Sequence, residues 1–343
     1  MLTTAMPAKK RKLLIVTGAF LLLLCVGLIL ITAGGPGPRP PLPNPNGYDD
    51  LVRASSFLVG DLNSTTELNQ ESLQTLISNN TAALQLVRTA LVRTCAVPTD
   101  VAITNMTGTL ANLSALKALA RLLMQEGRLA EMEGRPGDAT KSYLDAVRFG
   151  QQISRGGFII NRLVGIACEA IGAVPLSKLV PKLNREDAKR VAAELEKIEL
   201  DGVTWVEITQ NEKHYAYAQL RNGYNPIAFA MALWGGRQSR QKAESKHKLI
   251  SARLRLLSAE LAIRSYQSEQ GRPPTSLDQL VPQYMQHVPT DPFRAAPVNY
   301  IVQKTNWLLY SVGEDGIDDG GKPVGNSTSG TVRKGDFFYD SPY

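Results

Sequence analysis

An uncharged apolar stretch stands out near the start of the chain. Residues 13–32 consist mainly of Leu, Ile and Val, and none of them is charged. A helix of about 20 such residues, rising about 1.5 Å per residue, crosses a hydrocarbon core of roughly 30 Å. The pattern therefore predicts one transmembrane helix over residues 13–32.

The charges before this stretch predict its orientation. Residues 1–12 end in four consecutive basic residues, Lys9–Lys12. The positive-inside rule keeps such a tail in the cytoplasm, so the rest of the chain would lie across the membrane. The alternative is a cleaved signal peptide, because residues 32–35 are small enough for a cleavage site. The apolar region of a signal peptide is shorter, about 7–15 residues.

Residues 33–47 are rich in proline and glycine. Proline fixes φ and lacks an N–H donor, and glycine resists ordering, so such a stretch does not form a packed element. We expect a semi-extended linker between the membrane and the folded body.

Residues 48–240 show the apolar spacing of three and four that is typical of helices. In the first run, Asn69 is the expected N-cap and Pro98 ends the pattern. Residues 201–236 are less regular. We expect further helices over 112–133, 139–153, 159–179 and 185–198, with Asp138 and Asn184 as N-caps.

Within this part, residues 123–155 resemble one tetratricopeptide unit. Small and aromatic residues occupy its characteristic positions, namely Gly127, Gly134, Ala139, Tyr143 and Ala146. No clear second copy follows at a period of about 34 residues, and such solenoids need about three repeats. An ordinary helical hairpin is the alternative, and either arrangement leaves a groove for a partner.

The last part, residues 241–343, begins with a long helical pattern over 242–270, in which apolar residues such as Leu254 mark one face and charged residues such as Arg253 and Glu260 lie largely elsewhere. Gly271 is the expected left-handed cap, with Pro273 just beyond it. A short helix near 277–281 and strands over 298–303 and 307–312 follow. Residues 337–339 are a candidate third strand.

Several short motifs of this part follow one another in a specific order. They are Gly-Arg-Pro-Pro (271–274), Leu-Val-Pro-Gln-Tyr (280–284), Pro-Thr-Asp-Pro-Phe (289–293), Leu-Tyr-Ser-Val-Gly-Glu-Asp-Gly (309–316) and Gly-Asp-Phe (335–337). Residues 246–340 thereby resemble the C-terminal part of the major pseudopilin of type II secretion systems. The resemblance implies a long helix packed on a small antiparallel sheet, with a calcium-holding loop after the second strand.

The resemblance also implies particular calcium ligands. Asp315 matches the aspartate of the family's Gly-x-Asp-Gly segment, Val312 matches a backbone-carbonyl ligand, and Asp336 matches the second of two paired aspartates. Gly335 replaces the other expected aspartate. The apolar stretch 13–32 lacks the family's processing site and its glutamate, so we do not expect the chain to pack into a pseudopilus.

The residues of this loop themselves favour a cation. Asp315, Asp318 and Asp319 crowd three carboxylates into five residues, and the glycines around them let the backbone curl. Ca²⁺ prefers about 6–8 oxygen ligands from flexible loops. Asp318 or Asp319 could replace the missing ligand. The alternative is a solvated acidic turn, because Asp-Gly pairs are common in turns. The predicted set is Val312, Asp315, Asp318, Asp319 and Asp336.

Composition excludes several classes of function. The formal net charge is +7, but Lys9–Lys12 supply four of these charges, so no nucleic-acid partner is predicted. There is no CxxC motif, and Cys95 and Cys168 are either two buried thiols or, less favoured, a disulfide. The three histidines are scattered, so neither an enzyme nor a small-molecule substrate is indicated.

The sequence thus predicts an α+β protein with an N-terminal transmembrane helix, a mainly α-helical middle domain and a pseudopilin-like C-terminal domain. We expect it in the bacterial inner membrane, with most of the chain in the periplasm. Its expected function is that of a structural or interaction protein with a calcium-stabilised head, accessory to type II secretion or envelope assembly. The alternative is a helical adaptor that binds a protein or peptide, with a purely structural C-terminal module.

Overall fold

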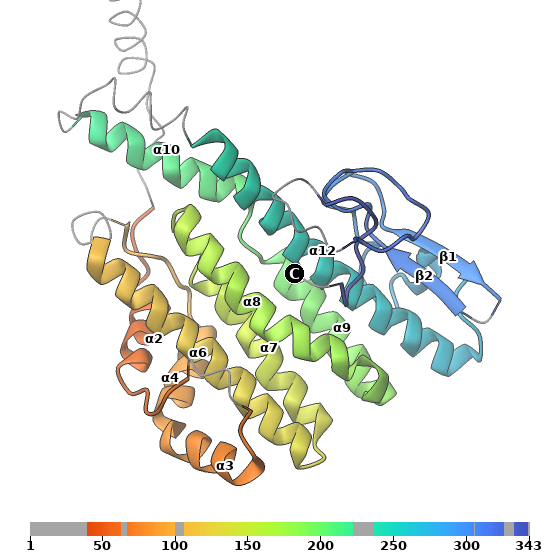
Figure 1. Ribbon diagram of the computed structural model, residues 1–343, viewed down its shortest axis with the longest axis horizontal. Coiled ribbons are helices and arrows are strands. Elements are labelled where there is room, and N and C mark those ends of the chain that lie inside the picture. Colours follow the sequence, from red (N-terminus) through yellow and green to blue (C-terminus); the bar gives the residue numbers. More distant parts are fainter. Residues whose placement is uncertain are drawn as a thin grey trace, which may run out of the picture. The chain divides into compact units, whose positions relative to one another are not determined.

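The structure is a computed structural model, shown in Figure 1. It describes residues 40–62, 67–99, 106–221, 236–304, 306–325 and 333–341. The predicted basic tail (1–12) and transmembrane helix (13–32) lie outside the described residues. Leu42–Ile208 and Arg240–Tyr343 form one compact unit, and residues 209–239 belong to another.

The expected linker ends earlier than predicted, because its last residues are packed. Asn46 is buried, and its side chain caps helix α2 (Gly47–Ser55) by accepting the Tyr48 N–H at 3.1 Å. The same amide donates to the carbonyl of Ala96 at 2.8 Å and accepts the Ala96 N–H at 3.0 Å. Asn46 thus holds the start of the folded body against the loop at Ala96, which is distant in sequence.

The single helical run expected after Asn69 is divided into α3 (Gln70–Asn79) and α4 (Thr81–Leu91). The N-cap at Asn69 is confirmed, since its side chain accepts the Ser72 N–H at 2.9 Å. The break falls at buried Asn80, whose amide accepts the N–H of Val59 and donates to its carbonyl, both at 2.9 Å. The helical run is therefore interrupted at Asn80, where the side chain bonds to a loop that is distant in sequence.

Four longer helices form the centre of the fold: α6 (Met106–Met132), α7 (Pro136–Gln152), α8 (Ile159–Leu179) and α9 (Arg185–Leu200). The N-cap at Asn184 is confirmed, because its side chain accepts the Asp187 N–H at 2.8 Å. Asp138 is not the N-cap of α7. That helix begins at Pro136, whose missing N–H suits the first turn, and Asp138 lies within this first turn.

Glycines let these helices approach closely. The ring of Tyr143 on α7 lies against Gly127 on α6, where a methyl group would overlap it. Further along α7, a methyl group on Gly150 would overlap the backbone carbonyl of Gly165 on α8. The predicted hairpin therefore packs through its small residues and its tyrosine.

Helix α8 also has the length and apolar composition of a membrane span. The relevant segment is Ile159–Lys182, and 56% of its most apolar window is buried inside the protein. A buried core helix has this same composition, so the finding carries no membrane assignment. Further along the chain, α10 (Trp205–Arg221) is helical where we expected irregular structure. Thr204 begins it by accepting the Glu207 N–H at 3.1 Å.

The long helix α12 (Arg237–Gln270) lies between two layers (Figure 1). One face packs on α7, α8 and α9 through Ile250, Leu254, Leu257 and Leu261. Other positions, Leu249, Ala252, Leu256 and Ala259, pack on the C-terminal segment. We expected one apolar face, and instead the helix is buried around much of its circumference. Its core residues therefore belong to both the helical part and the C-terminal part.

The C-terminal part contains a small antiparallel sheet. Strands β1 (Asn299–Gln303) and β2 (Asn306–Tyr310) pair with Asn299 opposite Tyr310. Gly271 ends α12 with a positive φ, as predicted, and a short helix follows at Leu277–Leu280. In place of a third strand, Phe337 forms a single bridge with Ser311. The coarse prediction of a mainly helical chain with a small antiparallel sheet is confirmed, and the pseudopilin resemblance stays a prediction.

The prediction of two separate thiols is also confirmed. Cys95 and Cys168 are both free and buried. Burial raises the pKa of Cys95 to about 12, so this thiol is not a reactive nucleophile.

Candidate binding groove on the helical layer

An open groove runs over the surface formed by α4, α6, α7 and α9. It consists of two adjoining cavities of about 570 Å³ and 1000 Å³. Both cavities are lined by Arg88, Asp145, Arg148 and Glu194, so they form one continuous depression. We call the whole depression, with all the residues that line either cavity, the charged groove.

The charged side chains reach the groove because of helical spacing. On α7, Asp138, Lys141, Asp145 and Arg148 lie three or four residues apart and so share one face. On α9, a second such stripe lines the groove with Arg190, Glu194 and Lys197, followed by Asp201 at the C-cap of the helix. These two polar stripes were the signal for the groove in the sequence, and we did not predict the groove from them.

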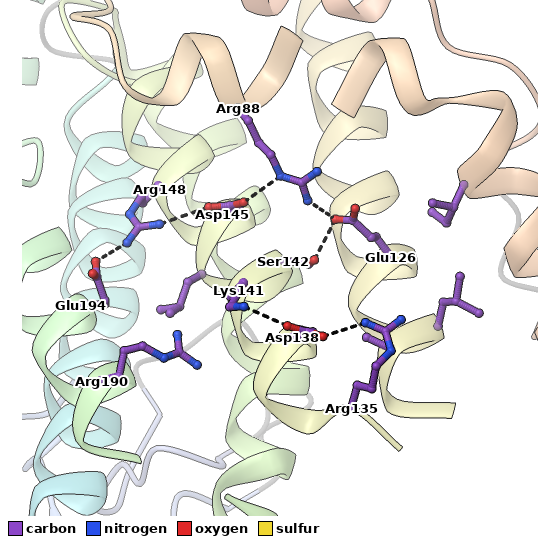
Figure 2. Close-up of a pocket in the computed structure, with 14 residues that line it drawn as sticks. Arg88, Glu126, Arg135, Asp138, Lys141, Ser142, Asp145, Arg148, Arg190 and Glu194 are labelled. Carbon is purple, nitrogen blue, oxygen red and sulfur yellow. Dashed lines mark hydrogen bonds and ion pairs between the residues drawn. The ribbon is translucent and has the colours of Figure 1, made fainter. Parts of the chain in front are cut away.

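Alternating charges cross the middle of the groove (Figure 2). Arg88 donates to Glu126 at 2.5 Å and lies 3.5 Å from Asp145. Arg148 donates to the other oxygen of Asp145 at 3.1 Å and also to Glu194. This row of five residues, which we call the ion-pair row, joins α6, α4, α7 and α9.

Partial burial shapes the electrostatics of this row. Burial raises the pKa of Asp145, although the neighbouring Arg148 and Arg88 act in the opposite direction. Burial by itself would lower the pKa of Arg88, but its hydrogen bonds and charge interactions with Glu126 and Asp145 outweigh this, so the pKa is raised. The Arg88 guanidinium therefore stays charged near neutral pH.

A second group of charges lies at the α7 start of the groove (Figure 2). Asp138 accepts from Lys141 at 2.9 Å and from Arg135 at 2.8 Å. The hydrogen bond from Lys141, followed by that from Arg135, lowers the pKa of Asp138. Nearby, Arg190 donates to Asp187 and to the hydroxyl of Thr140, both at 2.9 Å. At this end, too, the basic groups have carboxylate partners.

The opposite end of the groove is different. Arg93, Arg155 and Lys197 line it, next to the exposed side chain of Val92. Arg155 donates to the backbone carbonyl of Asp201 at 2.6 Å. Among the described residues, neither Arg155 nor Lys197 is paired with a carboxylate. We call this the cationic end of the groove.

Behind the groove lies a buried ion pair that sequence reasoning missed. Arg162 and Glu169, both on α8, are 1% and 0% exposed at their side chains and are hydrogen-bonded to each other. Gln151, which lines the groove, donates to Glu169 at 3.1 Å and accepts the Val203 N–H at 2.8 Å. Burial raises the pKa of Glu169, and Arg162 opposes the shift. A lone Arg and Glu in an apolar helix were the only sequence signal.

The predicted calcium ligands lie in the loop after β2, and they bond mainly to the loop's own donors. Asp336 is buried and accepts the N–H of Gly321 at 2.7 Å. It also accepts from the N–H groups of Lys322 at 3.2 Å and Asp319 at 3.4 Å. Burial raises the pKa of Asp336, and these hydrogen bonds oppose the shift.

Two of the other three carboxylates, those of Asp318 and Asp315, accept from different donors. Asp318 accepts from the hydroxyl of Tyr310 at 3.0 Å and from Gly320 at 3.1 Å. Asp315 accepts the N–H of Ile317 at 3.1 Å and that of Gly335 at 3.4 Å. Within the part of the chain that the structure describes, no three His, Cys, Asp or Glu side chains gather as a metal-binding group.

The loop also depends on a carboxylate that we did not predict. Asp291, from the Pro-Thr-Asp-Pro-Phe motif, is fully buried and accepts the N–H of Val312 at 2.8 Å. It accepts from the hydroxyl of Ser311 and the N–H of Phe293 as well, both at 2.9 Å. Val312 is thus held by Asp291. An aspartate between Thr and Pro in a tight loop was the signal for this role.

Comparison with known proteins finds no matching family model, no matching curated protein and no matching solved structure.

Proposed function

We propose that this chain is a membrane-anchored interaction protein whose charged groove binds an extended segment of a partner protein. The observation that carries the proposal is the groove itself, an open depression across α4, α6, α7 and α9 with an ion-pair row in its middle. Its size and polar lining suit a peptide segment better than a small apolar ligand, whose pockets are mostly hydrophobic.

The chemistry of the lining favours binding over catalysis. No histidine or cysteine is among the residues that line the groove. Its central carboxylates are engaged by arginines, so the groove lacks a free base beside a nucleophile, which catalysis of acyl or phosphoryl transfer would need. Paired charges at a rim instead give specificity for a partner of complementary charge.

The proposed location follows from the N-terminal sequence. The apolar stretch 13–32, preceded by Lys9–Lys12, is the proposed anchor in a bacterial inner membrane. The body, with its groove, would then face the periplasm. Protease added to intact spheroplasts is expected to digest the body, and protection of the body would overturn this placement.

Site-specific photo-crosslinking in cells tests the proposed binding. Val92, at the rim of the groove, is 86% exposed, and Ile317 in the acidic loop is 59% exposed. A photoreactive residue at position 92 of the full chain should give a defined crosslinked protein, and the same residue at position 317 should not. A crosslink from 317 alone would favour the C-terminal part as the interaction surface. The absence of a crosslink from position 92 would overturn the proposal that the groove is the binding site.

A calcium-stabilised, pseudopilin-like head is the second candidate function. Its support is the position of Asp336, which holds the turn at 319–322 beside a two-stranded sheet packed on α12. Under this proposal, Ca²⁺ raises the melting temperature of the full chain, chelator reverses the rise, and Asp315→Asn abolishes it. An unchanged melting temperature of the wild-type protein would remove calcium from the proposal.

A further inference from the structure

We infer that the segment bound in the charged groove is acidic, and that its carboxylates lie at the cationic end. This inference rests on the proposed function and names the chemistry of the partner. The cationic end carries the positive charges of Arg93, Arg155 and Lys197, and among the described residues only Arg93 of these three has a carboxylate partner. The rest of the groove is lined by paired charges.

The balance of charge is the first argument. Of the residues that line the larger cavity, five are basic and three are acidic. Arg148 and Arg88 are engaged by the ion-pair row with Asp145 and Glu194, so the surplus lies with the other three cations, against which Asp201 is the third lining carboxylate. Arg93 itself shares the single carboxylate of Asp50 with Arg53. A carboxylate of the partner would therefore meet cations that have no full counter-charge.

A buried hydrogen-bond acceptor is the second, independent argument. The side-chain oxygen Oε1 of Gln152, which lines the same cavity, is buried and has no donor among the described residues. An acceptor left unpaired in this way is unfavourable, because the buried oxygen has given up its hydrogen bonds to water. The backbone of an extended peptide supplies N–H donors at regular intervals, and such a donor is what this oxygen lacks among the described residues. A simple inorganic anion has no such donor.

The lining disfavours a nucleic acid. Three carboxylates of the ion-pair row, Glu126, Asp145 and Glu194, lie along the path that a phosphate backbone would take. No aromatic side chain lines either cavity, so there is no platform on which bases would stack. An acidic peptide needs cations at one end only, and the groove has this arrangement.

Selection from a library of random peptides displayed on phage tests the inference, with the full chain in detergent as bait. We expect enrichment of Asp and Glu over the unselected library. A selected peptide should bind Lys197→Glu about tenfold more weakly than wild type, because an attraction becomes a repulsion. Arg155→Gln should also weaken binding. Gln152→Met should weaken binding without lowering the melting temperature. A purely structural role of Gln152 would not explain this combination.

Lys178→Glu is the matched control, because Lys178 is exposed, lies outside the groove and undergoes the same charge reversal. It should bind the selected peptide as wild type does. The basic tail Lys9–Lys12 is present in every variant, so its own attraction for acidic peptides cancels in the comparison.

The outcomes separate the inference from the proposed function. Groove-dependent binding of peptides without acidic residues would overturn the inference and leave the proposed function standing. Tight binding of a random single-stranded DNA that competes with the peptide would also overturn it. If Lys197→Glu and Arg155→Gln bind peptides as wild type does, and position 92 gives no crosslink, both proposals fail.

Discussion

Arg162 donates its Nε–H to Nδ1 of His247 at 2.9 Å, and this bond joins α8 to α12 inside the protein. The guanidinium reaches Glu169 with its other nitrogens, so one arginine holds a carboxylate and a neutral imidazole together. Burial, followed by the charges of Arg162, Arg255 and Lys248, lowers the pKa of His247 to about 3. The imidazole must stay neutral for its Nδ1 to accept this bond.

This bond predicts a loss of stability in mild acid. The pKa of His247 is about 3 in the folded protein and near its ordinary value of 6.5 in the unfolded chain. Between these values the unfolded chain binds the extra proton. Stability is therefore fully present above pH 6.5 and falls as the pH drops, by about 1.4 kcal/mol per pH unit from this group. Denaturation at pH 6.5 and at about pH 5 measures the loss.

His247→Gln is the control for this prediction. The amide oxygen of Gln still accepts from Arg162 but does not titrate, so the variant should lose less stability over the same pH interval than wild type. The other histidines and the carboxylates remain in both proteins and cancel. Equal losses in the two proteins would show that His247 does not carry the effect.

The buried pair beneath this bond predicts a strong dependence on both partners. Arg162→Met leaves Glu169 buried without its cation, and we expect a loss of about 3–5 kcal/mol in the free energy of unfolding. Adding Glu169→Leu removes the uncompensated carboxylate and should restore much of that loss. Chemical denaturation of the two variants measures the difference. A double variant as unstable as the single one would contradict an electrostatic origin.

The contact between α7 and α8 predicts that Gly150 tolerates no side chain. A methyl group there would meet the backbone carbonyl of Gly165, which cannot move independently of its helix. We expect Gly150→Ala to lower the free energy of unfolding by about 1–3 kcal/mol. Gly325→Ala is the matched control, since nothing lies near the added methyl group. Its effect should stay within about 0.5 kcal/mol.

Local signals in the sequence were sufficient for much of the helical part and for the hairpin. Asn69, Asn184 and Gly271 mark helix ends through contacts within a few residues, so their roles could be predicted from neighbours alone. Asn80 and Asn46 carry the same residue type, but their partners Val59 and Ala96 are distant in sequence. A break or an anchor made by such long-range hydrogen bonds leaves no local pattern.

Partners that are distant in sequence also explain why the burial of α12 was not predicted. Arg253 and Glu260 interrupt its apolar pattern and suggested a solvent-exposed side. Both are buried, because Arg253 donates to the carbonyl of Ser341 and Glu260 accepts from Trp307 at 2.8 Å. In a sequence, charged residues predict a solvent-exposed helix face unless their hydrogen-bond partners in the fold are known. The groove was missed for a related reason, since its two stripes gain meaning only when α7 and α9 lie side by side.

The ion-pair row predicts a gain of binding from a single substitution. Asp145 lies between Arg88 and Arg148, and it offsets both of their charges. Asp145→Asn should leave these arginines with less counter-charge and so extend the cationic end toward the middle of the groove. An acidic peptide selected on the wild-type protein should then bind several-fold more tightly, with a steeper decrease as salt is added. Fluorescence anisotropy at two salt concentrations measures both effects. The control is Asp278→Asn, because Asp278 is exposed, lies outside the groove, and gives the same change of one unit in net charge. Equal affinities of Asp145→Asn and Asp278→Asn would mean that the peptide does not reach the ion-pair row.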